Sequence, residues 1–228
     1  MSLSFQEIAM NPRMLVAAGS AVVAAAMSSV VPAVQASSGA ISHGAASSVT
    51  GTARADRLRG SAGADVIRAR GGIDLVLAGA GDDTVFLGPG GSARAPEYGY
   101  GQGGDDRMDG GPGADKLAGM SGADRLVGGA GPDHLVGGGD DDVLDGGVGP
   151  DYLVPGEGVD VVRGGAGSDT FEVQPDGARD LIRCGPGYDE VLYWDDVDGL
   201  DVVADDCEQV LSRVSPLRLG GGQSAARP

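Results

Sequence analysis

Aspartate recurs at every ninth position along most of this chain. One series runs through Asp106, Asp115, Asp124, Asp133, Asp142, Asp151, Asp160 and Asp169, and an earlier series at the same interval comprises Asp56, Asp65, Asp74 and Asp83. An apolar residue stands two places after each of these aspartates. Short carboxylates in repeated turns supply the oxygen ligands that a hard cation such as Ca²⁺ prefers. The spacing therefore predicts metal binding.

The cleanest repeats, residues 110–118 and 128–136, have the form Gly-Gly-x-Gly-x-Asp-x-apolar-x. Glycines at positions one, two and four permit backbone conformations that a side chain disfavours, so the first six residues are expected to form a tight turn. The last three residues are expected to extend as a short strand with the apolar residue facing inward. Two repeats then make one 18-residue coil, and stacked coils give an all-β parallel β-roll, a β-helix or solenoid.

The predicted interior is a file of these apolar residues. Its members are Leu58, Ile67, Val76, Val85, Met108, Leu117, Leu126, Leu135, Leu144, Leu153, Val162 and Phe171.

Aspartates 18 residues apart would lie in adjacent coils, about 4.8 Å from one another. Their carboxylates repel one another unless a cation intervenes, and Ca²⁺ suits this arrangement better than Mg²⁺, which demands a smaller octahedron. The predicted carboxylate ligands are Asp65, Asp74, Asp83, Asp106, Asp115, Asp124, Asp133, Asp142, Asp151, Asp160 and Asp169, and the predicted carbonyl ligands are Gly110, Gly113, Gly119, Gly122, Gly128, Gly131, Gly146, Gly149, Gly164 and Gly167. Up to about eight ions would nearly cancel the net charge of −17.

Some repeats depart from the pattern. Met120, Asp140 and Pro155 stand where glycine is expected, which predicts strained or differently liganded turns around Asp124, Asp142 and Asp160. In the first block, Thr52, Arg54 and Arg70 replace glycines. The unit around Asp56 is therefore expected to be a cap and not a full binding turn.

The repeats divide the chain into segments. We expect a first repeat block at 51–86, a looped-out insertion at 87–100 where the nine-residue phase is lost, and a second block at 101–183. Residues 184–214 hold the only Trp and are expected to form a disulfide-closed cap over the last coil, with Tyr188, Tyr193 and Trp194 as an aromatic cluster. Residues 215–228 are expected to be a disordered tail.

The first 36 residues differ from the rest. Arg13 precedes an interrupted apolar run from Met14 to Val34, which is typical of an export signal cleaved after Ala36, although an uncleaved anchor is the alternative. Met10 or Met14 is an alternative start. Residues 37–50 are read as a flexible spacer. The sequence therefore predicts a secreted, extracellular protein.

Cys184 and Cys207 are the only cysteines. An even count in an exported chain favours one disulfide, and two reduced, buried cysteines are the alternative.

The composition argues against several classes of binding partner and of enzyme. A sequence pI near 4.2 argues against nucleic acid and anionic membranes as partners, and leaves cations as the natural ones. The only histidines are His43, in the spacer, and His134, at an outward position expected to be exposed to solvent. No Ser/His/Asp arrangement or phosphate-binding loop is evident. We therefore expect no catalytic residues and no enzyme activity.

The tandem repeats resemble the hemolysin-type calcium-binding repeats of RTX proteins. The ending, from Cys184-Gly-Pro-Gly-Tyr-Asp-Glu-Val to Asp206-Cys207-Glu-Gln-Val, is similar to that of small exported calcium-binding proteins of high-GC Gram-positive bacteria. The resemblance covers residues 51 to 210. It implies a parallel β-roll that holds calcium through Asp carboxylates and loop carbonyls and is disordered without the metal. Many members carry a lipase, protease or toxin domain and a C-terminal export signal, and this chain departs from that pattern.

Three functional hypotheses follow. The leading one is a stand-alone secreted protein whose repeats fold into a β-roll on binding several calcium ions. The alternatives are a calcium-stiffened surface adhesion or structural protein with a protein or surface partner, and a hydrolase accessory or toxin-like module.

Overall fold

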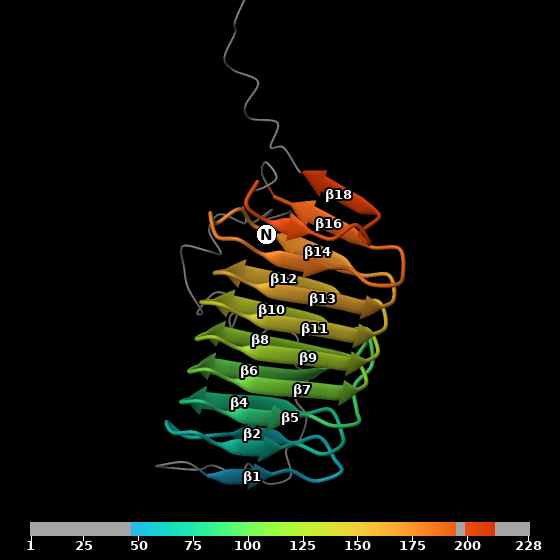
Figure 1. Ribbon diagram of the computed structural model, residues 1–228. Helices are drawn as coiled ribbons and strands as arrows, with labels where there is room; N and C mark the ends of the chain where they lie inside the picture. The colour runs from blue at the N-terminus through green and yellow to red at the C-terminus, as the bar shows by residue number, and fades with distance from the viewer. Residues whose placement is uncertain (1–46, 195–198, 213–228) are drawn as a thin grey trace, which may run out of the picture. The chain divides into compact units, whose positions relative to one another are not determined.

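The computed structural model describes residues 47–194 and 199–212, which belong to the second of two compact units, Met1–Gln35 and Ala36–Pro228. The expected signal peptide, most of the spacer and the expected tail lie outside the described residues. The described part of the second unit is built from parallel strands (Figure 1). It contains no helix long and apolar enough to cross a membrane.

Within the described residues, eighteen strands form two nine-stranded sheets, and successive strands alternate between the sheets. The first sheet contains β1 (Ser48–Thr50), β3 (Val66–Arg68), β5 (Thr84–Phe86), β7 (Arg107–Pro112), β9 (Arg125–Ala130), β11 (Val143–Val148), β13 (Val161–Ala166), β15 (Leu181–Arg183) and β17 (Val202–Val203). The second contains β2 (Arg57–Arg59), β4 (Leu75–Ala80), β6 (Glu97–Gly103), β8 (Asp115–Ser121), β10 (His134–Gly139), β12 (Tyr152–Glu157), β14 (Thr170–Val173), β16 (Glu190–Tyr193) and β18 (Gln209–Ser212). The predicted all-β parallel β-roll is confirmed.

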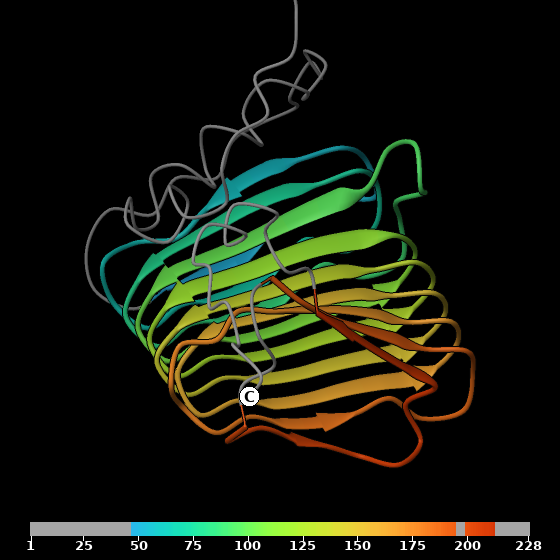
Figure 2. The same ribbon diagram turned by 90° about the horizontal axis from the view of Figure 1, so that it is seen from above.

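Strand register follows the sequence period. Leu126 pairs with Leu144, which lies 18 residues later, and Leu144 pairs with Val162. Every residue of the predicted inward file is buried, with at most 2% of its surface exposed. Figure 2, viewed from above, shows the two sheets facing each other across this interior. Stacking these side chains supplies the apolar burial that holds the coils together.

The strands in the middle of the solenoid are longer than the three residues expected. β9 and β11 each cover six residues, because their parallel pairing continues through the glycines that begin the next repeat. Gly129, for example, pairs with Gly147. Gly129 has a φ of 110° and Gly131 a φ of 130°, in the left-handed region that favours glycine. The turn and the strand of each repeat therefore overlap.

The prediction of a looped-out insertion at 87–100 is wrong at both ends. Leu87 is completely buried, and β6 begins at Glu97 and pairs with both β4 and β8. Gly88 and Gly90 still donate to the carbonyls of Gly110 and Pro112, and Gly90 forms a parallel bridge with Gly72. Residues 92–96, in which Ser92 and Ala95 pair with each other, leave the coil as the green loop that projects beyond the neighbouring turns in Figure 2. Gly99 occupies the inward position of β6, and a Cβ atom there would lie 2.7 Å from Cε of Met108 and 3.7 Å from Cδ1 of Leu87. These side chains fill the space that a larger inward residue would take.

The coils continue into the segment expected as a cap. β15 pairs with β17 and β16 pairs with β18, all in parallel. Tyr193 is buried and its hydroxyl donates a hydrogen bond to Oδ2 of Asp201 at 3.0 Å, whereas Tyr188 is largely exposed. The expected aromatic cluster is therefore wrong for Tyr188. Trp194 Nε1 donates a hydrogen bond to Oε1 of Glu172.

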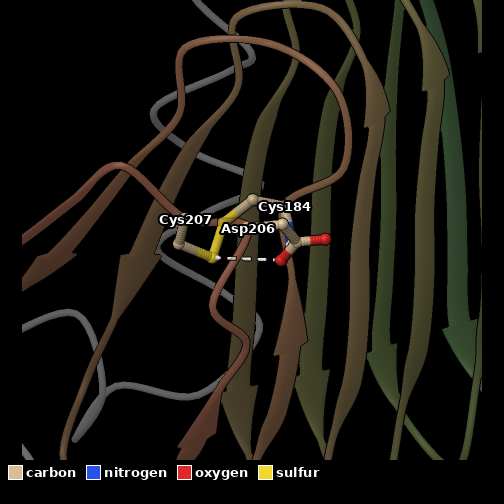
Figure 3. A group of neighbouring side chains, drawn as sticks. All are labelled: Cys184, Asp206 and Cys207. Atoms are coloured by element: carbon tan, nitrogen blue, oxygen red, sulfur yellow. Dashed lines mark hydrogen bonds between the residues drawn. A yellow bond between two sulfur atoms is a disulfide. The ribbon is translucent and has the colours of Figure 1, made fainter.

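A disulfide joins Cys184 to Cys207, with a Cα–Cα distance of 5.2 Å (Figure 3). This confirms the predicted bond over the alternative of reduced cysteines. Asp206 lies beside it, with Oδ1 3.9 Å from Sγ of Cys207. Both sulfurs are used in the disulfide, so this group, which alone among the described residues brings three potential ligand side chains within 4.8 Å of one another, is not a thiolate metal site.

Candidate metal-binding site

Acidic side chains form two files, one along each sheet at the start of its strands. The first file contains Asp65, Asp83, Asp106, Asp124, Asp142, Asp160, Asp180 and Asp201, and the second contains Asp56, Asp74, Glu97, Asp115, Asp133, Asp151, Asp169, Asp189 and Glu208. The members from Asp56 to Asp189 are buried, with at most 3% of their surface exposed. The structure thus brings every predicted carboxylate ligand into one of two files.

Backbone hydrogen bonds set the orientation of these carboxylates. The N–H group of most of these aspartates donates to Oδ1 of the acidic residue one coil later, as Asp124 does to Asp142 at 2.8 Å and Asp133 to Asp151 at 2.9 Å. The carboxylates therefore do not face one another directly across the gap, as the sequence suggested. Oδ1 of each such carboxylate lies against the backbone of the preceding coil, and Oδ2 takes no part in this hydrogen bond.

The second oxygen, Oδ2, is buried without a partner in most of the file. Among the described residues, no hydrogen bond reaches Oδ2 of Asp74, Asp83, Asp106, Asp115, Asp124, Asp133, Asp142, Asp151, Asp160, Asp169 or Asp189. A buried unpaired polar atom costs about 1–3 kcal/mol, and more when it is charged. Because such Oδ2 atoms recur along both files, a bound cation is the partner that suits them.

Carbonyl oxygens approach these Oδ2 atoms at the first glycine of each repeat. A Cβ atom on Gly128 would lie 2.6 Å from Oδ2 of Asp133 and 2.6 Å from the carbonyl oxygen of Gly146. On Gly146 it would lie 2.5 Å from both Oδ2 of Asp151 and the carbonyl oxygen of Gly164. Absence of a side chain therefore leaves a small volume lined by carboxylate and carbonyl oxygens.

This geometry brings several predicted carbonyl ligands near a carboxylate. The carbonyls of Gly119, Gly128, Gly146 and Gly164 lie beside the first glycine of the preceding coil, where an Oδ2 atom also lies. The carbonyl of Gly110 accepts a hydrogen bond from the N–H of Gly88 at 3.0 Å. The carbonyls of the fourth-position glycines, Gly113, Gly131 and Gly149, instead lie against the fourth-position glycine of the next coil, and that of Gly167 lies against Gly187.

Two of the predicted departures carry backbone strain. Met120 has a φ of 85° and Asp140 a φ of 72°, so the backbone of both residues adopts the left-handed conformation that glycine takes in other repeats. Pro155 stands at the first position of its repeat, where the left-handed conformation is not needed, and its carbonyl lies beside Gly137 together with Oδ2 of Asp142.

Burial raises the pKa of most of these carboxyl groups, and neighbouring carboxylates raise it further. The pKa rises to about 6 for Asp83, Asp124 and Asp160, to about 7 for Asp106, Asp115, Asp133, Asp151 and Asp180, and to about 8 for Glu97 and Asp142. It also rises for Asp74, Asp169 and Asp189. Both files therefore compete for protons near neutral pH unless a cation stabilises the charged form.

The first coil differs from the others. Oδ2 of Asp56 accepts hydrogen bonds from the N–H and hydroxyl of Thr52, at 2.6 and 2.8 Å. The hydroxyl of Ser47 donates to Oδ1 of Asp65, and the N–H of Ser61 to Oδ2. Burial raises the pKa of Asp65, but these hydrogen bonds lower it below its usual value. In the first coil, side-chain and backbone hydrogen-bond donors therefore stabilise the carboxylate charge that a cation would stabilise in later coils.

The carboxylate ligands predicted from the sequence omit six acidic residues of the two files: Asp56, Glu97, Asp180, Asp189, Asp201 and Glu208. Glu97 pairs in register with Asp115, 18 residues later, and this spacing could have revealed it. Asp180 and Asp189 accept the N–H groups of Asp160 and Asp169 at 2.9 and 2.8 Å. Asp201 and Glu208 continue the two files by one coil. Insertions between coils hide these last four from a strict nine-residue count.

His134 is half-buried, contrary to the expectation of full exposure. Its ring meets that of Tyr152 edge-on with the centroids 4.8 Å apart. Burial, and secondarily the charge of Lys116, lower the pKa of His134 to about 4. His43 lies outside the described residues.

Parallel coils with two files of buried carboxylates define a β-solenoid of the metal-binding class. The donors that converge are carboxylate and carbonyl oxygens, which suits a hard cation such as Ca²⁺. The RTX calcium-binding nonapeptide repeat matches the chain in four copies, at residues 50–85, 100–117, 118–153 and 155–172. The chain therefore belongs to the family of proteins with RTX calcium-binding repeats. A comparison with curated proteins gave no match.

Proposed function

We propose that this chain is a secreted calcium-binding protein whose tandem repeats fold into the β-roll on binding several Ca²⁺ ions. The observation that carries the proposal is the repeated Oδ2 atom, buried and unpartnered among the described residues, beside a carbonyl oxygen of the next coil. Family membership supports calcium as the cation.

Bound calcium would supply positive charge at the two files. The Asp carboxylates, through Oδ2, and the carbonyls of the first-position glycines would hold the ions. Without them, ionised carboxylates in adjacent coils repel one another and lack hydrogen-bond donors, which favours the unfolded chain. Pairs of neighbouring coils allow about eight ions over the repeats predicted from the sequence, and the proposal assigns the carboxylates to this role and not to catalysis.

Export is the second part of the proposal. The apolar run before Val34 supports it, and so does the disulfide between Cys184 and Cys207, because disulfides persist in oxidising compartments. The test is expression of the full chain in a secreting bacterial host, followed by N-terminal sequencing of the protein in the medium. A new N-terminus at Ser37 supports the proposal, and retention of the full-length chain in the cell contradicts it.

Calcium binding is tested by titration calorimetry at pH 8 after chelation and removal of the chelator. The expected result is several ions per chain, with dissociation constants in the range of about 10⁻⁴ to 10⁻³ M typical of extracellular modules. Circular dichroism should show strand signal gained over the same calcium range. A chain that binds no calcium at millimolar concentrations refutes the proposal.

A further inference from the structure

The outward side chains of the second sheet are mostly apolar. On each strand, the residues on either side of the inward position face away from the interior, where polar side chains are usual. Among these outward residues from β4 to β12, Lys116 is the only charged one, because the pKa of His134 lies at about 4. The full set is Leu75, Leu77, Tyr98, Tyr100, Lys116, Ala118, His134, Val136, Tyr152 and Val154.

The first sheet shows that the repeat does not impose this composition. Each of its strands from β7 to β15 has at least one charged outward residue, and together these are Arg107, Asp109, Arg125, Asp145, Arg163 and Arg183. Both sheets are built from the same nine-residue repeat, so the fold does not require an apolar outer face. A broad apolar face on a folded protein marks an interaction surface.

No described strand lies over this outer face, because every strand of residues 47–194 and 199–212 belongs to one of the two facing sheets. Tyr100 and Ala118 are buried, and the other eight residues of the set are half-buried. The half-buried side chains retain apolar surface that a partner can cover.

The two ends of the face carry opposite charges. At one end, β2 presents Arg57 and Arg59, which are both exposed. Towards the other end, β14 presents Glu172 and β16 presents Glu190. Glu172 accepts a hydrogen bond from Trp194 Nε1. A basic end, an apolar centre and an acidic end make a pattern that complements a reversed copy of itself.

A two-fold axis parallel to the strands, between β8 and β10, brings two such faces together. This rotation reverses the order of the strands and keeps the position along each strand. β2 of one copy therefore lies over β16 of the other, with Arg57 opposite Glu190, and the contact occurs twice. At the centre, Lys116 of one copy lies opposite the uncharged ring of His134.

The face is large enough for a stable complex. Eight strands from β2 to β16 stack in order along the second sheet (Figure 1). At about 4.8 Å per strand they extend for about 38 Å, and a six-residue strand is about 20 Å long. The projected area is thus roughly 700 Å², close to the value of about 800 Å² per partner in a standard interface.

We propose that the outer face of the second sheet binds a second copy of this chain in a two-fold, antiparallel dimer. The apolar strands β4 to β12 form its centre, and Arg57 and Glu190 pair at both ends. This inference goes beyond the proposed calcium binding, because none of the outward residues belongs to the two carboxylate files.

The first test is sedimentation velocity on the purified protein at pH 8 in calcium, over a concentration series into the high micromolar range. Calcium is included because ions on the two files would offset the net charge of −17, which otherwise repels a second copy. We expect a dimer for the unaltered chain and a monomer for Val136→Lys. Val127→Lys is the matched control, because Val127 is also a half-buried outward valine at the third position of its strand, but on the first sheet. It should remain dimeric.

The second test is a charge exchange, which remains informative if Val136→Lys does not fold. Arg57→Glu and Glu190→Arg should each weaken dimerisation by about tenfold, because the contact occurs twice and the reversed charge repels its partner. The double variant should restore the dimer. Within one chain the two residues lie seven strand spacings apart, about 34 Å, so restoration can only arise between copies.

The outcomes separate this inference from the proposed function. Calorimetry should show the same calcium binding for the unaltered chain, Val136→Lys and the charge variants. A folded, calcium-bound chain that sediments as a monomer at every concentration overturns the dimer and leaves the calcium proposal standing. A dimer that Val136→Lys leaves intact, or that the double variant does not restore, also overturns the inference.

Discussion

Replacement of Asp142 by Asn should stabilise the fold strongly without calcium and much less with calcium. Asp142 is 1% exposed, its Oδ1 accepts the N–H of Asp124 at 2.8 Å, and no described residue donates to its Oδ2. An asparagine keeps the acceptor for this N–H and removes the charge. The substitution therefore separates the cost of burying a carboxylate from the benefit of binding an ion.

The magnitude without calcium follows from the pKa. Burial, then nearby carboxylates, raise the pKa of Asp142 from 3.8 to about 8. A carboxyl group with a raised folded-state pKa contributes stability that is present below its unfolded pKa and is lost as pH rises through its folded pKa. At pH 8 the ionised group in the folded state therefore costs up to about 5 kcal/mol, at about 1.36 kcal/mol per pKa unit, before the chain relaxes. Asp142→Asn removes that cost.

The magnitude with calcium follows from mass action. Loss of an ion present at about 100 times its dissociation constant costs about 2.7 kcal/mol. Asp142→Asn forgoes this gain, so its advantage of up to about 5 kcal/mol in chelator should fall to about 2 kcal/mol in calcium. For a domain of about 150–250 residues, the loss of about 2.7 kcal/mol narrows the difference in melting temperature between the two chains by roughly 5 to 10 °C.

The assay is circular dichroism on both proteins, as a pH series from 4 to 9 in chelator and as thermal melts at pH 8 in about 10 mM calcium, with Kd near about 10⁻⁴ M. In chelator we expect both chains to be folded in acid and to unfold as pH rises, with Asp142→Asn unfolding at higher pH. Asp109→Asn is the matched control, because Asp109 is exposed. An Asp142→Asn chain that gains no stability in chelator, or that gains the same amount in calcium, would refute the reasoning.

Three further predictions concern the scaffold. Gly131→Ala should destabilise the calcium-loaded fold by at least about 1–2 kcal/mol in thermal melts, because φ is 130° and the new Cβ would clash with a backbone carbonyl, whereas Gly199→Ala, where a Cβ meets nothing within 4 Å, should match the unaltered chain. Leu135→Ala should cost about 2–5 kcal/mol in urea unfolding with calcium present, because the completely buried side chain leaves a cavity. Reduction of the Cys184–Cys207 disulfide, which spans 23 residues, should cost about 3 kcal/mol, measured by protease sensitivity of the last coils.

The repeat period predicted the solenoid and its register. Nine-residue spacing places Leu126 beside Leu144, because two repeats complete one coil, and the structure pairs them. Alternation of side chains along a strand then assigns the inward file. Local rules of this kind suffice because each coil contacts only its neighbours.

The insertion could not be placed from the period alone. Gly99 stands at an inward position where apolar side chains stand in other repeats, and Glu97 stands where aspartate is expected. Both substitutions hide a coil that the structure completes with Leu87, the residue that follows β5. Packing between coils, and not sequence pattern, decides where the chain leaves the solenoid.

Details of the carboxylate site also required the structure. The spacing placed aspartates of adjacent coils together, but it did not show that the N–H of Asp124 would engage one oxygen of Asp142 and leave the other free. Nor did it assign Asp180 and Asp189 as ligands, because two extra residues between Asp169 and Asp180 interrupt the nine-residue count. Hydrogen-bond direction depends on the stacked backbone, which no single repeat specifies.

Small-angle X-ray scattering on the full chain at pH 8, in chelator and then in calcium, tests the central claim most directly. The account predicts an expanded chain in chelator that becomes compact on adding calcium, with strand signal appearing together with the compaction. A chain that is equally compact in both conditions would contradict the claim that buried carboxylates need cations for the coils to stack.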